Sequence, residues 1–372
     1  MPKDAEKMYE RIEVLGKGSF GLVWMCQRKI KPVDDFDDEY VAVKNIEIKE
    51  EKGKVYAQRE ISILTELRHP NVIRLIRAFP VYNDISRLVS LQLARGPNLQ
   101  RIVGKRGALG LPLCRLISRE LVAAVSYLHG RGVLHRDIKP TNLILENTEI
   151  RPVEYYDYSH DNSIWSDGED AEEMIKRGKW KVMLVDFGFA RALEASEVYL
   201  EGDDSSKNDN DKIKEAPNGG IPDKNRRVSV TQQKVRSMSA LGTKAYAAPE
   251  IKHQLRNKTA ADLEKTNAAL TECVADYGMI VDAYSVGWTL RVILTGVPPN
   301  QTISKYMRKY HGQEPSVEIF DEVSTKSKEK PSFRVRDTDE MPQEATLFIS
   351  SLTKKDPEER MSIRQAQLHP WI

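Results

Sequence analysis

Cysteine is scarce in this 372-residue sequence, and the few cysteines stand far apart. The three of them, Cys26, Cys114 and Cys273, are odd in number and share no metal-binding spacing. They offer neither a disulfide framework nor a zinc motif, so we expect a reducing compartment. The cytoplasm is the expected location, with the nucleus as the alternative.

Long apolar runs and an excess of one charge are also missing. No segment is long and apolar enough to predict a membrane-spanning helix. The first residues, "MPKDAEKMYERIEVLG", lack the apolar centre of a secretory signal and the glycine needed for myristoylation. The 57 Lys and Arg nearly balance the 55 Asp and Glu, so no overall field attracts nucleic acid or a membrane. We therefore expect neither as a partner.

The apolar pattern of the remaining sequence divides the chain into two parts. Residues 9–93 form short alternating runs rich in Val, Ile and aromatics, which predict strands, and one helical pattern at 55–67 interrupts them. After Gly96 the long apolar patterns are helical, as in "LPLCRLISRELVAAVSYLHGRG" and "DAYSVGWTLRVILTG". The sequence thus predicts an α+β fold in one domain, 1–372, with a sheet-rich lobe at 9–93 and a mainly helical lobe at 94–372.

Four polar segments fit neither pattern and are expected to loop out of the second lobe as insertions: 147–178, 195–236, 252–276 and 300–340. The first is acidic, with no Lys or Arg between Glu154 and Glu173. It is either a docking segment for a basic partner or a solvated loop.

The segment "GKGSFGLV" places Gly16, Gly18 and Gly21 between two predicted strands. Glycines let backbone N–H groups approach a polyphosphate without obstruction by a Cβ atom. The alternative is a glycine-rich hairpin without a ligand. No helix follows, so a dinucleotide-binding turn is excluded.

A lysine in the strand "VAVK" is the next candidate. Alternation puts Val41 and Val43 on one face of the strand, and Ala42 and Lys44 on the other. A small neighbour leaves room for a flat ring, and Glu60 in the following helix is a possible partner for Lys44. The alternative is a surface ion pair worth at most about 1 kcal/mol.

Two loops carry oxygen and amine groups suited to phosphate chemistry. In "LHRDIKPTNLIL", Asp137 can accept a hydroxyl proton, Lys139 can neutralise a phosphoryl group, and Asn142 can bind a metal through its amide oxygen. The apolar strand "KVMLV" ends at Asp186, where a carboxylate suits Mg²⁺. Taken alone, Asp186 is equally an ordinary turn residue.

In this order, the segments resemble the eukaryotic protein kinases. The resemblance runs from Tyr9 to Ile372 and adds "APE" at Ala248–Glu250 and a late Arg360. "DFGFA" and "HPWI" are most similar to the calmodulin-regulated group. The resemblance implies the two-lobed kinase fold, a monomer, and ATP and Mg²⁺ as cofactors.

The resemblance also assigns roles to residues. Asp137 would accept the proton of the substrate hydroxyl, and Lys139 would contact the γ-phosphate. Thr243 would form a hydrogen bond near these two residues. Asn142 and Asp186 would bind Mg²⁺. The ATP site would comprise Leu15, Gly16, Gly18, Gly21, Val23, Ala42, Lys44, Glu60, Gln92, Leu93 and Ile144, with Leu91 guarding the back pocket. Structural roles would fall to the stacked residues Leu64, Leu75, His135 and Phe187, to the pair Glu250–Arg360, and to Asp282 as anchor of the catalytic loop.

Regulation is expected in the long segment between Asp186 and Glu250. Arg136 would bind a phosphate on Ser239, added by an upstream activating kinase, with Ser237 as the nearest rival; the alternative is an unmodified serine. Ser229, in "RRVSV", is either a site for an Arg-directed kinase or part of a solvated basic loop.

The substrates are expected to be proteins with target Ser or Thr. Arg-directed kinases carry Glu where this chain has Asn98, Thr141 and Val292, so we predict little preference for Arg before the target residue. The resemblance thus implies an active Ser/Thr protein kinase. The alternatives are a catalytically weak scaffold that acts through its insertions and a kinase of small molecules, against which Lys139 and the "APE" segment speak.

Overall fold

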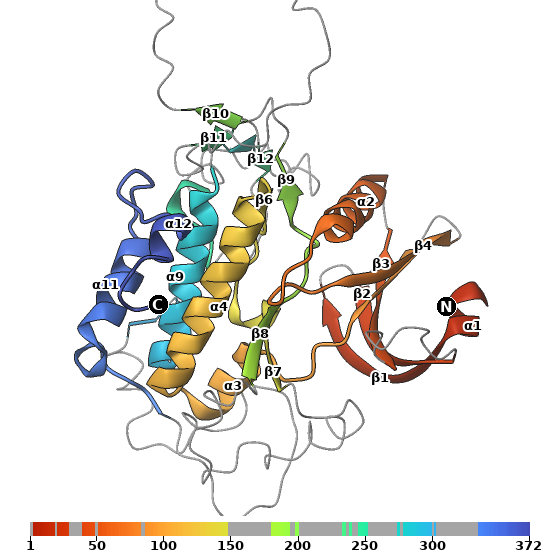
Figure 1. Cartoon of the computed structure of the whole chain (residues 1–372), viewed down its shortest axis with the longest axis horizontal. Coiled ribbons are helices and arrows are strands. Elements are labelled where there is room, and N and C mark those ends of the chain that lie inside the picture. The colour runs from red at the N-terminus through yellow and green to blue at the C-terminus, as the bar shows by residue number, and fades with distance from the viewer. Residues whose placement is uncertain are drawn as a thin grey trace, which may run out of the picture.

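The chain is described by a computed structural model that covers residues 3–18, 21–29, 39–48, 51–82, 86–147, 180–193, 198–200, 233–235, 238–239, 245–251, 274–275, 278–299, 301–302 and 334–372 (Figure 1). Most of the four expected insertions falls outside these ranges. The folded part consists of two lobes, as expected, with a sheet-rich lobe beside a larger helical lobe (Figure 1).

The smaller lobe is a five-stranded antiparallel sheet in the order β1-β2-β3-β5-β4. Its strands are β1 (Tyr9–Gly18), β2 (Gly21–Arg28), β3 (Tyr40–Glu47), β4 (Leu75–Tyr82) and β5 (Ser86–Gln92). The predicted helix is α2 (Glu51–Glu66). The alternation expected for β3 is confirmed, because Val41 and Val43 join one apolar cluster while Ala42 joins another.

An N-terminal helix, α1 (Lys3–Met8), was not predicted. Its Ala5 is fully buried in the cluster that also contains Val41, Val43 and Phe79. This cluster covers the outer face of the sheet, so the smaller lobe begins before residue 9.

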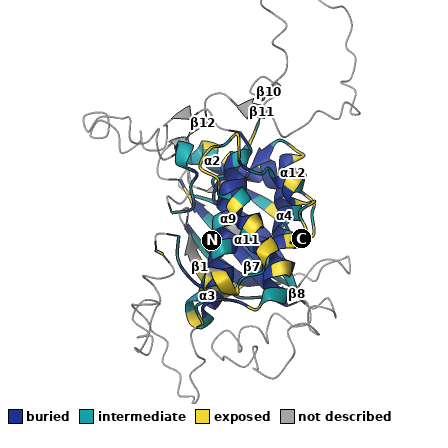
Figure 2. Cartoon of the chain, turned by 90° about the vertical axis from the view of Figure 1, so that its left-hand side faces the viewer, coloured by how far each residue is buried: buried dark blue, intermediate teal, exposed yellow. Residues whose placement is uncertain are grey.

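The larger lobe is built on two long helices, α4 (Leu111–His129) and α9 (Ile280–Thr295), which pack against each other. Figure 2 shows the buried residues gathered along these helices in the middle of the molecule. Around them lie α3 (Leu99–Arg106), α11 (Gln343–Leu352), α12 (Ile363–Ala366) and the short 3-10 helices η1 (Pro140–Asn142) and η7 (Thr338–Glu340). None of the helices within the described ranges has the length and apolarity needed to cross a bilayer.

Short two-stranded antiparallel pairs lie outside the main sheet. They are β6 (Val133–Leu134) with β9 (Arg191–Ala192), and β7 (Leu143–Asn147) with β8 (Trp180–Leu184). Two further pairs join β10 (Val198–Leu200) to β11 (Gln233–Val235), and β12 (Met238–Ser239) to β13 (Val274–Ala275). Asn147, the first residue of the first expected insertion, is the last residue of β7.

The last expected insertion, 300–340, extends too far. Arg336 is only 1% exposed, and its guanidinium donates to the carbonyl oxygens of Leu294 and Leu109 at 2.6 and 2.7 Å. The backbone of Arg334 also bonds to the end of α3. Residues 334–340 thus belong to the folded lobe, because their backbone and one buried cation complete the packing of α3, α4 and α9.

Candidate active site

Lys44 on β3 joins two carboxylates from different parts of the chain. Its Nζ lies 2.7 Å from Oε1 of Glu60 on α2 and 2.8 Å from Oδ1 of Asp186, which follows β8. The side chains of Lys44 and Glu60 are 6% and 2% exposed, so the reading as a surface ion pair is wrong. The pair fixes α2 against the sheet and connects both to the larger lobe.

Burial and neighbouring charges have opposing effects on the pKa values of Lys44, Glu60 and Asp186. Burial lowers the pKa of Lys44, but Glu60 and Asp186 outweigh it, and the pKa stays above its usual range. Burial raises the pKa of Glu60 above its usual value in spite of Lys44. At Asp186, burial is outweighed by Lys44, and the pKa of the carboxyl is lowered. Lys44 and Asp186 are therefore charged at neutral pH.

The backbone of Asp186 adopts an uncommon conformation. Its φ is 63°, a region that L residues other than Asn, Asp and His rarely occupy. The backbone N–H of Gly188 bonds its Oδ1 at 3.4 Å. This turn directs the carboxylate toward Lys44. An aspartate that only ended the strand would not need this orientation.

The catalytic-loop candidates form one hydrogen-bonded group around Asp137. Lys139 Nζ lies 2.8 Å from Asp137 Oδ2. Asn142 Nδ2 donates to the backbone oxygen of Asp137 at 2.8 Å and to Asp137 Oδ2 at 2.9 Å. Both bonds use the amide nitrogen, so the amide oxygen of Asn142 is the atom that a cation would use.

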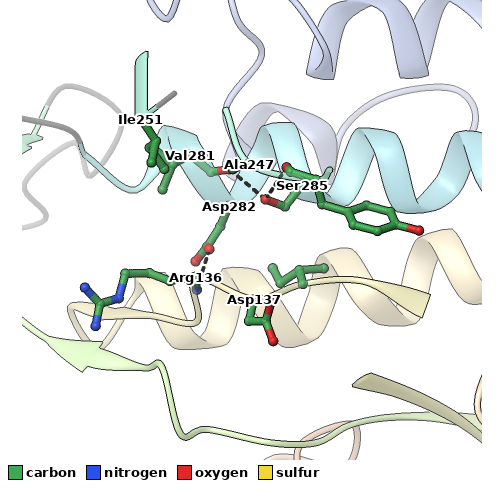
Figure 3. A pocket seen from close by; sticks show the side chains of 9 residues that line it. Arg136, Asp137, Ala247, Ile251, Val281, Asp282 and Ser285 are labelled. Atoms are coloured by element: carbon green, nitrogen blue, oxygen red, sulfur yellow. Dashed lines mark hydrogen bonds between the residues drawn. The ribbon is translucent and has the colours of Figure 1, made fainter. Parts of the chain in front are cut away.

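Asp282 on α9 holds this loop from behind. Its Oδ2 accepts from the backbone N–H of His135 at 2.9 Å and lies 3.1 Å from His129 Nε2, and its Oδ1 accepts from the backbone N–H of Arg136 at 2.9 Å. Figure 3 shows Asp282 reaching from α9 toward Arg136, with Asp137 on the same loop. Burial is outweighed by His129 and His135, which keep the pKa of Asp282 below its usual range. Arg136 has a φ of 64°, so the anchored turn is a tight one.

The four expected stacked residues lie in or against the central core. The rings of His135 and Phe187 meet edge to face with centroids 4.9 Å apart, and both residues are at most 1% exposed. Leu64 is buried in the main cluster, and Leu75 packs against it. Burial lowers the pKa of His135, so the imidazole is neutral near pH 7.

The glycines at the tip of the β1–β2 pair differ in what requires them. Gly21 has a φ of 140°, and a Cβ there would stand 1.9 Å from the backbone oxygen of Asn45. A Cβ at Gly16 would meet nothing within 4 Å. The fold itself therefore demands Gly21, whereas Gly16 borders open space, as a phosphate cradle needs. Gly18 closes the ladder opposite Gly21.

The expected adenine-binding residues lie on strands that face one another. Ala42 on β3 is paired with Leu91 on β5, and both are 8% exposed. Val23 and Ile144 pack against the same core from β2 and β7, and Leu15 on β1 is 40% exposed. In the linker between the lobes Leu93 is buried, and the backbone N–H of Gln92 is bonded to the carbonyl oxygen of Arg74.

A divalent cation fits this site. Asn142 on the catalytic loop and Asp186 after β8 provide two oxygen-bearing groups. Mg²⁺ is usually held by one or two carboxylates together with substrate phosphates and water. Within the described ranges no group of three His, Cys, Asp or Glu side chains gathers, and Asn142 with Asp186 is the kind of partial ligand set that Mg²⁺–phosphate sites use.

Several predicted residues cannot be placed in the site. Thr243, Ser237 and Ser229 lie outside the described residues. Ser239 lies in β12, where its backbone pairs with Val274, and only its backbone is described.

The three positions at which Arg-directed kinases carry Glu hold neutral residues here. Asn98 Oδ1 accepts from the backbone N–H of Arg101 and so caps α3. Val292 is buried within α9, and Thr141 is exposed on η1. The described residues thus place no carboxylate at these three positions.

The pair Glu250–Arg360 is bidentate. Arg360 Nη1 lies 2.7 Å from Oε1 and Nη2 lies 3.0 Å from Oε2 of Glu250. The arginine side chain is fully buried and also lies over the ring of Tyr284 at 4.9 Å. It fastens the "APE" segment to the larger lobe, and Ser285 Oγ adds a bond to the backbone oxygen of Tyr246 at 3.1 Å.

Three participants were missed in the sequence. His129, six residues before His135, supplies a partner to Asp282. Arg191 on β9 is paired with Leu134 and so lies beside the strand that leads into Arg136. Asn71 donates to Glu120 Oε2 at 2.9 Å and ties the loop after α2 to α4. A basic residue five positions after Asp186 was the available signal for Arg191.

Comparison with known proteins agrees with this geometry. The family model described as "Protein kinase domain" matches residues 9–204 and 227–372. "Probable serine/threonine-protein kinase fhkA" of Dictyostelium discoideum is 24% identical over 99% of this chain and 50% of that protein. "Calcium/calmodulin-dependent protein kinase type 1" of Caenorhabditis briggsae is 26% identical over 98% of this chain and 72% of that protein.

A third relative is "Serine/threonine-protein kinase RAD53" of Saccharomyces cerevisiae, 26% identical over 97% of this chain and 32% of that protein. The chain thus spans from about a third to about three quarters of the length of these relatives. The two-lobed α+β fold and the family expected from the motifs are confirmed. This chain belongs to the protein kinase domain family.

Proposed function

We propose that the chain is an ATP-dependent protein kinase that phosphorylates Ser and Thr hydroxyls of proteins. The arrangement of Lys44 between Glu60 and Asp186, beside the Asp137 group, is the observation that carries the proposal. These groups are of the types that phosphoryl transfer uses, and none is replaced by an inert residue. The names of the relatives support the choice of Ser and Thr.

The residues of the chain would divide the work as follows. Lys44, fixed by Glu60, binds the phosphates of ATP, and Asn142 and Asp186 would hold Mg²⁺, which supplies positive charge at the phosphates when bound. Asp137 accepts the proton as the hydroxyl oxygen bonds to the γ-phosphorus and the bond to the ADP oxygen breaks. Lys139, 2.8 Å from Asp137, orients that carboxylate and balances charge on the transferred group.

The acceptor is the first point to test. Labelled γ-phosphate from Mg·ATP is offered to peptides that differ only in carrying Ser, Thr or Tyr, and to small alcohols and sugars. We expect label on Ser and Thr peptides. Transfer only to small molecules, or ATP binding with no transfer to any protein, would instead support the small-molecule kinase or the scaffold.

Regulation by the segment after Asp186 is part of the proposal. Arg136 Nε donates to the backbone oxygen of Phe189 at 2.7 Å, so its guanidinium lies against this segment, and Arg191 is close by in the strand pair. A phosphate on Ser239, or on Ser237, would add about −1.5 to −2 charges for these cations to bind. An upstream kinase would add it, and another would act on Ser229. Mapping the phosphorylated residues and comparing Ser239→Ala with Ser237→Ala tests the choice.

As part of the proposal, the enzyme would act as a monomer in the cytoplasm, with the nucleus as the alternative, and without a membrane or nucleic-acid partner. Fractionation of cells and light scattering on the purified chain test these points.

A further inference from the structure

The chain between Asp84 and Glu120 contains no acidic residue. The same stretch carries seven basic ones: Arg87, Arg95, Arg101, Lys105, Arg106, Arg115 and Arg119. The full chain has 55 acidic residues in 372, so a stretch of this length would ordinarily include several. This one-sided charge is concentrated on α3, whose eight residues include three of the seven.

Helix electrostatics disfavours this arrangement at Arg101. Asn98 is the N-cap of α3, which makes Arg101 the third residue of the helix. The positive end of the helix dipole favours acidic side chains there, and α3 has none in its first turn. Lys105 follows at i+4, where a like charge is destabilising. Arg101 and Lys105 are thus unfavourable for the stability of α3 itself, which indicates that they serve another function.

The environment of Lys105 agrees with a concentrated positive field. Burial lowers the pKa of its ammonium group, and Arg101 and Arg106 lower it further. Arg101 and Lys105 are nonetheless solvent-exposed, so an incoming anion can reach them.

A fourth cation arrives from a distant part of the chain. The backbone of Arg334 is hydrogen-bonded to the residues at the C-terminal end of α3. Its N–H donates to the carbonyl oxygen of Arg106 at 2.9 Å, and its carbonyl oxygen accepts from the N–H of Ala108 at 2.6 Å. Arg334 is exposed. The basic face of α3, defined as Arg101, Lys105, Arg106 and Arg334, is therefore composed of two separate segments.

This face flanks the catalytic loop. Helix α3 packs against η1, the turn between Lys139 and Asn142, and Asn98 forms a backbone bridge with Ile144 on β7. Thr141 is exposed on η1, which begins three residues after Asp137. Helix α3 therefore lies next to the turn that directly follows the expected base.

We propose that the basic face of α3 binds acidic residues of the protein substrate and so selects substrates with Asp or Glu near the target hydroxyl. This inference rests on the proposed kinase activity and deepens it. Asn98, one of the positions that carry Glu in Arg-directed kinases, is neutral here and caps the helix that carries Arg101 and Lys105, so this face attracts acidic segments and repels basic ones. Because the contacts are exposed, the preference weakens as salt is raised.

The test uses the full chain and three peptides with the same target Ser, flanked upstream by Asp and Glu, by Ala, or by Arg. We expect kcat/KM to be about tenfold higher for the acidic peptide than for the alanine peptide, since several exposed charge pairs each add a modest gain. In the double variant Arg101→Glu/Lys105→Glu, the acidic-to-alanine ratio falls to one or below. Arg364→Glu on α12, an equally exposed basic residue, is the control and keeps the ratio of the wild type.

The outcomes separate the two proposals. No transfer to any of the peptides by the wild type contradicts the kinase activity, and fluorescence anisotropy of the labelled acidic peptide then still tests the basic face. Transfer with equal ratios in wild type, double variant and control overturns the selection of acidic substrates. Tighter binding of single-stranded DNA or anionic vesicles than of the acidic peptide, lost in the double variant, would overturn it in favour of another polyanion.

Discussion

Replacing Asp282 by Asn tests whether the anchor behind the catalytic loop is as important as its geometry indicates. The carboxylate is fully buried and accepts from the backbone N–H groups of His135 and Arg136 and from His129. An amide has one acceptor oxygen. Its best orientation keeps the oxygen toward His135 and His129, and turns the NH2 group toward the N–H of Arg136.

The cost can be worked from this substitution. One hydrogen bond to a charged acceptor is lost and one buried backbone N–H remains unsatisfied, which together destabilise the fold by about 3 kcal/mol. The turn at Arg136 also shifts, and a displacement of about 1 Å at Asp137 lowers kcat by about 10²-fold.

Urea unfolding at pH 7 measures the first quantity, and phosphoryl transfer at saturating ATP measures the second. Asp339→Asn is the control, because Asp339 is exposed on η7. A loss of stability equal to that of the control, within about 0.5 kcal/mol, would refute the reasoning.

Four further residues can each be perturbed or titrated singly. Glu250→Gln leaves the fully buried Arg360 without its carboxylate and should lower the free energy of unfolding by about 3 kcal/mol in urea; an unchanged midpoint would contradict this. The hydroxyl of Ser90 is buried and has no hydrogen-bond partner in the described part of the chain, so Ser90→Ala should raise stability by up to about 1 kcal/mol in the same assay, and a loss would contradict it. Arg101→Glu places an acid in the first turn of α3 and should stabilise the protein by about 0.5–1 kcal/mol, so that lost selectivity cannot be ascribed to unfolding; a lower melting temperature would oppose this. Burial keeps His135 neutral, with a pKa below 6.5, so its contribution to stability is present above pH 6.5 and is lost as pH falls below it; an NMR titration showing protonation at or above pH 6.5 would disagree.

The sequence was informative where chemistry and local pattern coincide. Strand alternation placed Ala42 and Lys44 on one face of β3, and the structure agrees because both faces of that strand are covered by separate clusters. The partner of Lys44 was found at Glu60 because a helix follows the strand, and helix α2 presents that position inward.

Other features depend on contacts that no local pattern reveals. Helix α1 forms because Ala5 enters a cluster to which all five strands of the sheet contribute, and the pattern of its six residues alone does not predict this. Helix α12 stops at Ala366, and Trp371 beyond it donates to Ser118 Oγ at 2.9 Å, a contact across 253 positions of the chain. The link from His129 to Asp282 spans 153 positions and depends on the packing of α4 against α9.

The most direct test of the central claim compares the wild type with Asp137→Asn. Transfer of labelled phosphate from Mg·ATP to a Ser peptide is measured together with ATP binding to the same preparations. If Asp137 is the base, the rate falls by about 10²–10⁴-fold while ATP binds equally well, because the nucleotide contacts are made by other residues. Equal transfer by both proteins would contradict the account.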